Sequence, residues 1–356
     1  MPYDDHETDP GLLGTGGSPL VSVVIAVYDG MSHIEDACIS ALNQTYPSLE
    51  VIVVDDGSTD ETNRIVATLA ASDPRVRLIR QQNRGVASAR NAGIAAASGE
   101  FVAPLDADDV WEKTKLERQV RRLQECGSET GLVYCWWAWI DVNGIVLDRS
   151  PRWQIEGHVL NKLIEVNFTG GASVPLYRRV GIEEVGGYSM DLRERGSQGC
   201  EDWDLALRIA ERYGVAVVPA VLVGYRRRGD SMSAGCDTMW RSQMQVLSSL
   251  ATRQPEISPA VLRRASGQFA LYLAGVSFWS GNYLQACRWA LRARSFALWR
   301  AVFPHVARML ARRWLGTEPR QARTSLQNPR FDESDLPEPL MPYDRIYERH
   351  WDGQGE

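Results

Sequence analysis

The strongest constraint on the fold of this chain is a pattern that repeats through its first 110 residues. An apolar, β-branched run is followed each time by a stretch with helical periodicity. The apolar runs are residues 21–27, 50–54, 76–79 and 100–105, and the helical stretches are 32–43, 58–71 and 87–97. Strand-then-helix units of this length are typical of a parallel sheet with helices on its faces. The sequence therefore predicts an α/β fold with a mostly parallel sheet flanked by helices.

Acidic residues stand where these predicted strands end. Asp29 follows the first strand, Asp55 and Asp56 follow the second, and Asp106 and Asp108 follow the fourth. Ligands of such sheets bind beyond the carboxyl ends of the strands, so we expect these carboxylates to converge on one crevice. Like charges at close range resist ionisation unless a cation compensates them. Because hard oxygen ligands suit Mg²⁺ or Mn²⁺, the pattern favours a divalent metal site.

The acidic cluster also has an alternative interpretation as a polar loop before a helix. A helix is expected to begin near Trp111, and Asp109 would then be a helix-start residue rather than a ligand. In the same way, Ser58 stands three residues before Glu61, which is the spacing of a capping box. The second half of the chain is less regular. Its predicted elements are a hairpin of residues 132–142 and 145–148 with a type I′ turn at Asn143-Gly144, helices at 157–166 and 201–213, and extended runs at 168–177 and 215–226.

Composition limits the partners and the compartment. The formal net charge is -6, which argues against nucleic acid as a general partner. The six cysteines form no Cys-x-x-Cys pair and have no His at ligand spacing, so neither a zinc site nor a disulfide framework is indicated. The acidic, Gly-rich start of the chain lacks the basic and apolar regions of a signal peptide. We therefore expect a cytoplasmic protein.

Four motifs follow one another in a fixed order: VSVVIAVYD at 21–29, VVDDGSTD at 53–60, NRGVASARNAG at 83–93 and LDADD at 105–109. Together they strongly resemble family 2 glycosyltransferases of the GT-A fold. The resemblance continues through GGY at 186–188 and EDWDL at 201–205 and ends near Tyr225-Arg226, so it covers roughly residues 20–235. It implies an inverting enzyme that moves a sugar from a nucleotide-diphosphate sugar, usually a uridine diphosphate (UDP) sugar, to a hydroxyl of a glycan, lipid-linked or other acceptor.

The resemblance also implies roles for residues at the donor. Asp56 would accept a hydrogen bond from the nucleobase, and Asp108, helped by Asp106, would hold Mg²⁺ or Mn²⁺ on the diphosphate. Val27, Asp29 and Asn83 are further donor-binding candidates, although relatives often carry Asn at the position of Asp29. A metal that bridges diphosphate oxygens stabilises the charge that develops as the glycosidic bond breaks.

Three arginines are candidate phosphate ligands. Arg84 and Arg90 suit the diphosphate because a guanidinium matches phosphate oxygens bidentately. The competing interpretation is that one of them pairs with Asp55 or Asp106, and Asp55 itself is expected to bond to backbone amides. Arg228 stands where many relatives have a His after the Tyr-Arg pair. Because Arg cannot ligate a metal, we expect it to contact the diphosphate directly.

The expected catalytic residues are Asp202, as the general base, and its neighbour Glu201. The resemblance places the second carboxylate of this pair beneath the acceptor hydroxyl, where it would remove the proton during in-line attack. A single displacement of this kind inverts the anomeric centre. The alternative is that both acids merely favour the positive end of a helix dipole. Residues 196–200 just before them are suited to a loop that covers a site.

Two groups of aromatic residues each have two possible roles. Trp136, Trp137 and Trp139 lie on or near one strand, with Trp137 expected on the face opposite the other two, and they would fill the core or stack on an acceptor sugar. The second group is a helical stripe beside Arg300, Arg308, Arg312 and Arg313, formed by Trp299, Val302, Phe303, Val306, Leu310 and Trp314. It would dock peripherally on anionic lipid at the inner face of the membrane, or pack on its own domain.

The domain boundaries follow from these patterns. We predict a disordered lead-in at 1–18, a GT-A domain at 19–235, a helical region at 236–316 and an extended acidic tail at 317–356. Within the GT-A domain, 19–110 would form the donor half and 111–235 the acceptor half. Two other functions stay open: a sugar nucleotidyltransferase and a catalytically inert carbohydrate-binding relative. The first is disfavoured because no Gly-rich loop with a basic residue follows residues 21–27, and the second because the acidic residues are intact.

Overall fold

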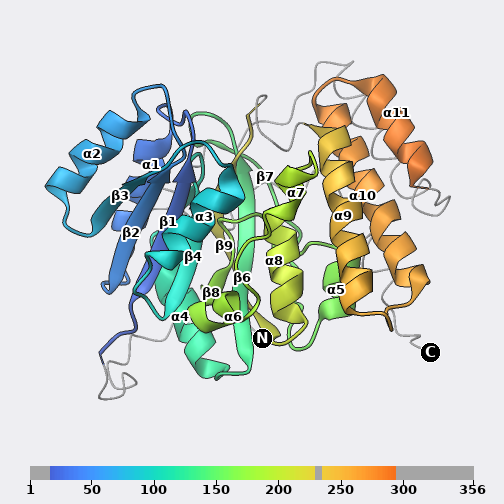
Figure 1. Cartoon of the computed structure of the whole chain (residues 1–356), viewed down its shortest axis with the longest axis horizontal. Helices are drawn as coiled ribbons and strands as arrows, with labels where there is room; N and C mark the ends of the chain where they lie inside the picture. Colours follow the sequence, from blue (N-terminus) through green and yellow to red (C-terminus); the bar gives the residue numbers. More distant parts are fainter. Residues whose placement is uncertain (1–16, 229–234, 294–356) are drawn as a thin grey trace.

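The computed structural model of the chain describes residues 17–228 and 235–293. In these residues, nine strands form one mixed sheet in the order β3-β2-β1-β4-β8-β6-β9-β5, with β7 paired to β6. Helices cover the sheet, and a group of three helices packs beside it at the C-terminal end of the described chain (Figure 1). The expected α/β architecture with a helical C-terminal region is confirmed.

The donor half alternates strands and helices as predicted. Its elements are β1 (Val21–Val27), α1 (Ile34–Leu42), β2 (Leu49–Asp55), α2 (Thr62–Ser72), β3 (Val76–Arg80), α3 (Val86–Ala95) and β4 (Phe101–Asp106). β1 pairs in parallel with β2 and β4, and β2 pairs in parallel with β3. The carboxyl ends of these strands therefore meet at one edge, where the acidic residues lie.

The acceptor half is mixed. Its elements are β5 (Val110–Trp111), α4 (Lys115–Glu125), β6 (Thr130–Ile140), β7 (Val146–Arg149), α5 (Leu160–Glu165), β8 (Leu176–Arg178), α6 (Arg179–Glu184), α7 (Asp191–Glu194), α8 (Glu201–Ala210) and β9 (Gly214–Arg226). β8 pairs in antiparallel fashion with both β4 and β6 and so joins the two halves. β9 pairs in parallel with β6 and in antiparallel fashion with β5.

Three helices follow the sheet: α9 (Cys236–Arg253), α10 (Pro259–Trp279) and α11 (Tyr283–Arg292). α10 packs against α5, α9 and α11. A turn at Gly281, which has a φ of 78°, separates α10 from α11. In the described part of the chain, no helix combines the length and the apolar character that crossing a membrane requires.

The prediction that a helix begins near Trp111 was wrong. Val110 and Trp111 form β5 instead, and α4 begins only at Lys115. Asp109 is therefore not a helix-start residue. Its carboxylate accepts hydrogen bonds from the Ser173 hydroxyl at 2.6 Å and from the Arg226 backbone N–H at 2.9 Å. Pairing with β9 thus determines the conformation of this segment, which the local sequence does not reveal.

Three other local predictions also failed. The Ser58 hydroxyl does not cap α2 but accepts a hydrogen bond from the Asp29 backbone N–H at 2.9 Å, and α2 starts at Thr62. The predicted hairpin exists as β6 and β7, yet Gly144 has a positive φ of 80° and Asn143 does not, so the turn is not type I′. Finally, strand pairing within the extended run 168–177 begins only at residue 176.

Several predicted segments lie outside the described residues. Most of the lead-in 1–18, the whole acidic tail 317–356 and the aromatic and arginine stripe between residues 299 and 314 belong to this group. The proposed boundaries of the GT-A domain at 19 and 235 remain predictions.

Close packing of α3 on the sheet depends on a glycine. An added Cβ at Gly93 would lie 2.4 Å from Val24 Cγ1 and 3.3 Å from Val54 Cγ2. Val24 and Val54 belong to β1 and β2, so a side chain at this position would push α3 away from both strands. The same helix carries Arg90 and Asn91, and Asn91 exchanges two hydrogen bonds of 2.8 Å with the Tyr188 backbone. The glycine therefore sets the position of residues at the sheet edge.

We expect Gly93→Ala to destabilise the protein by about 1–3 kcal/mol, because overpacking outweighs the better helix propensity of Ala. Thermal unfolding followed by circular dichroism measures the change. Gly17→Ala is the control, because an added Cβ there meets nothing within 4 Å. An unfolding temperature for Gly93→Ala equal to that of the control would contradict the close-packing argument.

Candidate active site

Asp55 has the structural role expected of it. Its side chain is fully buried, and Oδ1 accepts a hydrogen bond from the Ser58 backbone N–H at 2.8 Å. Oδ2 accepts one from Asn63 at 3.3 Å and lies 3.6 Å from Arg80 Nε. These bonds hold the turn after β2, and the adjacent Asp56 is positioned by that turn.

Asp56 anchors the loop that precedes α3. Its backbone N–H donates to the Val27 carbonyl at 2.8 Å, so the ends of β1 and β2 are tied together. Its carboxylate accepts hydrogen bonds from the backbone N–H groups of Arg84 at 2.8 Å and Gly85 at 2.7 Å, and from the Gln81 amide at 2.7 Å. Asp56 is buried, and the nucleobase contact expected of it remains a prediction.

The other donor candidates lie around this loop. Asp29 has a positive φ of 49°, which Asp and Asn tolerate better than most residues, and its Oδ1 accepts a hydrogen bond from the Thr59 backbone N–H at 2.7 Å. Asn83 accepts one from Arg193 Nη2 at 2.9 Å, and Arg84 is exposed. Arg193, on α7, also lies over Gly85, where an added Cβ would be 2.2 Å from Arg193 Nη1. No pattern in the sequence predicts this contact.

Arg90 joins the donor half to the acceptor half. Its guanidinium donates from Nη2 to Asp106 Oδ1 at 2.6 Å and from Nη1 to Asp202 Oδ1 at 2.5 Å, and it lies over the Tyr188 ring at 5.1 Å. Only 3% of the residue is exposed. Of the two interpretations given for Arg90, the structure contains the pairing with Asp106, and a contact of Arg90 with phosphate stays a prediction.

The electrostatics of this cluster follow from burial of several charges together. Burial would lower the pKa of Arg90, but Asp202 and Asp106 outweigh it and raise the pKa well above its usual value. Burial, opposed by Arg90 and supported by the charges of Asp106 and Glu201, raises the pKa of Asp202 to about 7. A carboxylate with a pKa near neutrality is suited to accept and release a proton.

Asp106 and Asp108 are held by residues far away in the sequence. The Ser173 hydroxyl accepts a hydrogen bond from the Asp106 backbone N–H at 3.0 Å and donates to Asp109. Arg226 Nε donates to the Asp108 backbone carbonyl at 2.7 Å. Burial and then the Asp106 charge raise the pKa of Asp108 to about 6, whereas burial, Asp108 and Asp106 raise the pKa of Asp109 well above its usual value.

A divalent cation fits this cluster only with help from a ligand. Among the described residues, no three His, Cys, Asp or Glu side chains gather as they would around a metal ion. Asp106 and Asp108 retain 28% and 26% side-chain exposure, and Arg228 Nη1 lies 3.7 Å from Asp108 Oδ2. Mg²⁺ commonly uses one or two carboxylates and completes its shell with water and substrate phosphates. The two carboxylates therefore fit a metal that is shared with a diphosphate.

Glu201 and Asp202 open α8 as predicted, but their side chains differ. Glu201 is buried, and its Oε2 accepts a hydrogen bond from the Gly199 backbone N–H at 2.7 Å. It therefore holds the loop before the helix. Asp202 accepts a backbone hydrogen bond from Ala172, keeps 23% side-chain exposure and lines a cavity. Of the two residues, only Asp202 belongs to the described wall of this cavity, and the base role expected of it remains a prediction.

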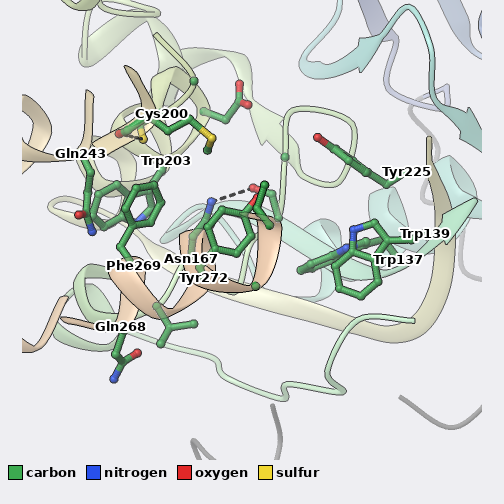
Figure 2. Close-up of a pocket in the computed structure, with 18 of the residues that line it drawn as sticks. Trp137, Trp139, Asn167, Cys200, Trp203, Tyr225, Gln243, Gln268, Phe269 and Tyr272 are labelled. Atoms are coloured by element: carbon green, nitrogen blue, oxygen red, sulfur yellow. Dashed lines mark hydrogen bonds between the residues drawn. The ribbon is translucent and has the colours of Figure 1, made fainter. Parts of the chain in front are cut away.

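This cavity has a volume of about 650 Å³ and lies between the sheet and the C-terminal helices. Figure 2 shows Trp137, Trp139 and Tyr225 on one side and Gln243, Trp203 and Phe269 on the other, with Tyr272 between them. Within the described part of the chain, its lining includes Asp202 and Arg228 but not Asp56, Asp106 or Asp108. The cavity therefore meets Asp202 and Arg228, while Asp56, Asp106 and Asp108 lie outside its described wall.

The prediction for the three tryptophans of β6 was wrong in one respect. Trp137 and Trp139 both line the cavity, with ring centroids 6.0 Å apart and planes at 83°. Trp136 packs instead in a separate cluster with Val110 and Val221. The strand alternates as strands do, so residues 137 and 139 share a face and residue 136 does not. Sequence reasoning also missed Phe269, Tyr272 and Gln243, which come from helices outside the recognised motifs.

Comparison with known proteins agrees with this geometry. The family model of glycosyl transferase family 2 matches residues 22–170. Glycosyltransferase GlyG of Streptococcus pneumoniae is 38% identical over 109 residues, which are 30% of this chain and 36% of GlyG. The chain spans about half or less of the length of the curated relatives that it matches.

Two solved structures have a similar fold. S. aureus TarS 1-349 in complex with UDP-GlcNAc aligns with a TM-score of 0.57 at 17% identity and covers 81% of this chain and 87% of its own. Mannosyltransferase PcManGT from Pyrobaculum calidifontis, in complex with GDP-Man and Mn²⁺, aligns with a TM-score of 0.53 at 21% identity and covers 85% of this chain and 81% of its own. Residues 22–170 therefore match glycosyl transferase family 2, and the structural likeness shows that the chain has the mixed α/β fold of these two proteins, the GT-A fold.

Proposed function

We propose that this protein is an inverting, metal-assisted glycosyltransferase that uses a nucleotide-diphosphate sugar, most often a UDP sugar, as donor. The observation that supports it most is the contact of Arg90 with both Asp106 and Asp202. It places a candidate metal ligand and a candidate base on either side of one guanidinium, at the edge of a cavity large enough for a sugar. The names and bound donors of its relatives support the same reaction class.

On the donor side, the nucleotide would lie over the loop that Asp56 anchors. Asp106 and Asp108 would hold Mg²⁺ or Mn²⁺ on the diphosphate, where the cation would stabilise the negative charge of the leaving group. Arg228 lies beside Asp108 and also lines the cavity, so its guanidinium is placed to contact the diphosphate as the glycosidic bond breaks. Exposed Arg84 is a second candidate for such a contact.

On the acceptor side, Asp202 would remove the proton from the attacking hydroxyl. The hydroxyl oxygen then bonds to the anomeric carbon while the bond to the diphosphate oxygen breaks, and the proton stays on the Asp202 carboxyl. Arg90 fixes the orientation of this carboxylate, and the Ala172 backbone hydrogen bond supports it. Attack from the cavity, opposite the leaving group, inverts the anomeric configuration.

The other two functions have less support. After β1, the turn at Asp29 and Gly30 is held by Ser58 and Thr62 and carries no basic residue, unlike the phosphate loop that a nucleotidyltransferase needs. An inert binding protein would have no need of a carboxylate with a pKa of about 7 at the edge of its cavity.

We also propose that α11 contacts anionic lipid, which would place the enzyme near a lipid-linked acceptor. The outward face of this helix exposes Leu284 by 87% and Leu291 by 72%, beside exposed Arg288 and Arg292. Asp237 pairs with Arg288 at 3.8 Å, but α11 itself contains no acidic residue. An apolar and basic helix face is suited to the interface of an anionic membrane.

Replacing the base tests the mechanism. Asp202→Asn should reduce sugar transfer by about 10²- to 10⁴-fold, because it removes general base catalysis and leaves the shape of the site. Binding of UDP with Mn²⁺, measured by calorimetry, should persist. Asp191→Asn is the matched control, since Asp191 lies nearby on α7 and is largely exposed. Transfer by Asp202→Asn at the rate of the control would contradict the assignment.

Donor chemistry can be read from thermal stability. UDP and UDP sugars should raise the unfolding temperature in the presence of Mn²⁺ and lose this effect when EDTA removes the metal, because only the bound complex stabilises the fold. Asp108→Asn should abolish the metal-dependent part. Parallel titration with guanosine diphosphate sugars tests the choice of base. If nucleotides raise the unfolding temperature equally with and without metal, and equally in the Asp108→Asn variant, the proposed metal role is excluded.

Membrane contact should depend on the apolar face of α11. The double variant Leu284→Glu and Leu291→Glu should sediment less with vesicles of anionic phospholipid, by about tenfold at low salt, because each carboxylate opposes insertion and is repelled by the surface. Val180→Glu, which changes an exposed apolar residue of α6, is the control. Equal sedimentation of the double variant and the control would rule out this face as the contact.

A further inference from the structure

One wall of the cavity comes from helices that lie beyond the part matched to the family. Gln243 belongs to α9, and Gln268, Phe269 and Tyr272 belong to α10, whereas the family match ends at residue 170. α9 and α10 share an apolar cluster that includes Met239 and Leu273, and other residues of the two helices, such as Val246 and Ala265, pack in the main core. These helices therefore add a surface that faces the candidate base and differs in origin from the donor site.

Gln243 has a buried polar atom without a partner. The residue is 2% exposed, and its Nε2 donates a hydrogen bond to the Ala265 carbonyl at 3.3 Å. Its Oε1 accepts no hydrogen bond from the described residues, and the Oε1 of Gln268, also in the cavity wall, has none either. Unpaired buried carbonyl oxygens are unfavourable and rare, so their place in a cavity wall indicates donors supplied by a bound molecule.

Aromatic rings face these amides across the cavity. The Trp137 and Trp139 pair forms one side, and Phe269 and Tyr272, with centroids 5.6 Å apart and planes at 30°, lie toward the other (Figure 2). Aromatic rings offer large apolar faces, and an adjacent polar group fixes the orientation of what lies against them. A sugar ring has both an apolar C–H face and outward hydroxyl donors.

The charged groups of the cavity wall already have partners. Glu165 pairs with Arg264 at 2.6 Å, Arg227 lies over the Trp139 ring at 4.5 Å, and Asp202 is held by Arg90. Arg228 also lines the cavity and lies beside Asp108, so it is the wall formed by α9 and α10 that offers neutral amides and rings rather than a cation for a phosphate or carboxylate.

We infer that the cavity binds a neutral glycosyl unit of the acceptor, with a hydroxyl of the sugar donating to Gln243 Oε1 and its ring packed against Tyr272 and Phe269. α9 and α10 then determine which acceptor is used. This inference rests on the proposed function, because it takes Asp202 as the group that faces the acceptor hydroxyl.

Glycan binding tests the inference without turnover. The full chain, with UDP and Mn²⁺ present, is applied to an array of neutral oligosaccharides, acidic oligosaccharides and a short-chain prenyl phosphate. Binding to members of the neutral set is expected, and the affinity for the strongest of them is then measured by quenching of tryptophan fluorescence. Preference for the acidic glycans or for prenyl phosphate, or no binding to any neutral oligosaccharide, would overturn the inference.

Substitutions in α9 and α10 test which side chains of the cavity wall contact the oligosaccharide. Gln243→Leu should weaken binding of that oligosaccharide about tenfold while its unfolding temperature stays equal or rises, because an unpaired buried oxygen is removed. Gln245→Leu on the same helix is the control, because Gln245 does not belong to the cavity wall in the described structure. Tyr272→Ala should weaken binding by a similar factor. Tyr272→Phe should bind as tightly as the unmodified protein, because the aromatic ring remains.

The two proposals fail in different ways. If UDP with Mn²⁺ still stabilises every one of these variants, their donor site is intact. Unchanged oligosaccharide affinity in Gln243→Leu would then refute only the proposed binding of the acceptor by this wall. Absence of metal-dependent stabilisation of the unmodified protein by both uridine and guanosine diphosphates and their sugars would instead refute the proposed function.

Discussion

The ion pairs of Arg90 are the interactions on which the arrangement of the site depends. Asp106 ends a strand of the donor half, and Asp202 opens a helix of the acceptor half, 112 residues from Arg90 in the sequence. Without a cation between them, two carboxylates at the edge of a buried region would repel each other and resist ionisation. Arg90 lies almost fully buried beneath both. It compensates their charge and also fixes the distance between the two halves of the site.

Sequence patterns predicted the elements that carry the site, because those patterns are local. β-branched runs gave the strands, and the position of Asp202 at a helix start followed from residues next to it. The direction of a long side chain is not local. The sequence allows Arg90 to bind a phosphate or to pair with a carboxylate, because a guanidinium suits both. The cavity wall was missed because α9 and α10 reach it only through tertiary packing.

The failed local predictions have a common physical cause. Ser58 and Asp109 each have the sequence context of a residue that starts a helix, yet distant groups take their hydrogen bonds. The Asp29 backbone N–H donates a hydrogen bond to the Ser58 hydroxyl, and the Ser173 hydroxyl and the Arg226 backbone N–H donate to the Asp109 carboxylate. A helix cap contributes about 1 kcal/mol, which several tertiary hydrogen bonds at the sheet edge readily exceed. Such overrides are concentrated here at the edge where the candidate ligands lie.

The short strand β8 has a consequence for how a protein with the proposed function could change its substrates. Tyr177 is in register with Val102 of β4 on one side and with Leu132 of β6 on the other, so both halves share one continuous sheet. The alignment of the proposed donor and acceptor sites then depends on one continuous sheet. Loops and added helices on either side can vary independently of one another. New acceptors would therefore be acquired by altering α9 and α10, with no change in how the leaving group is held.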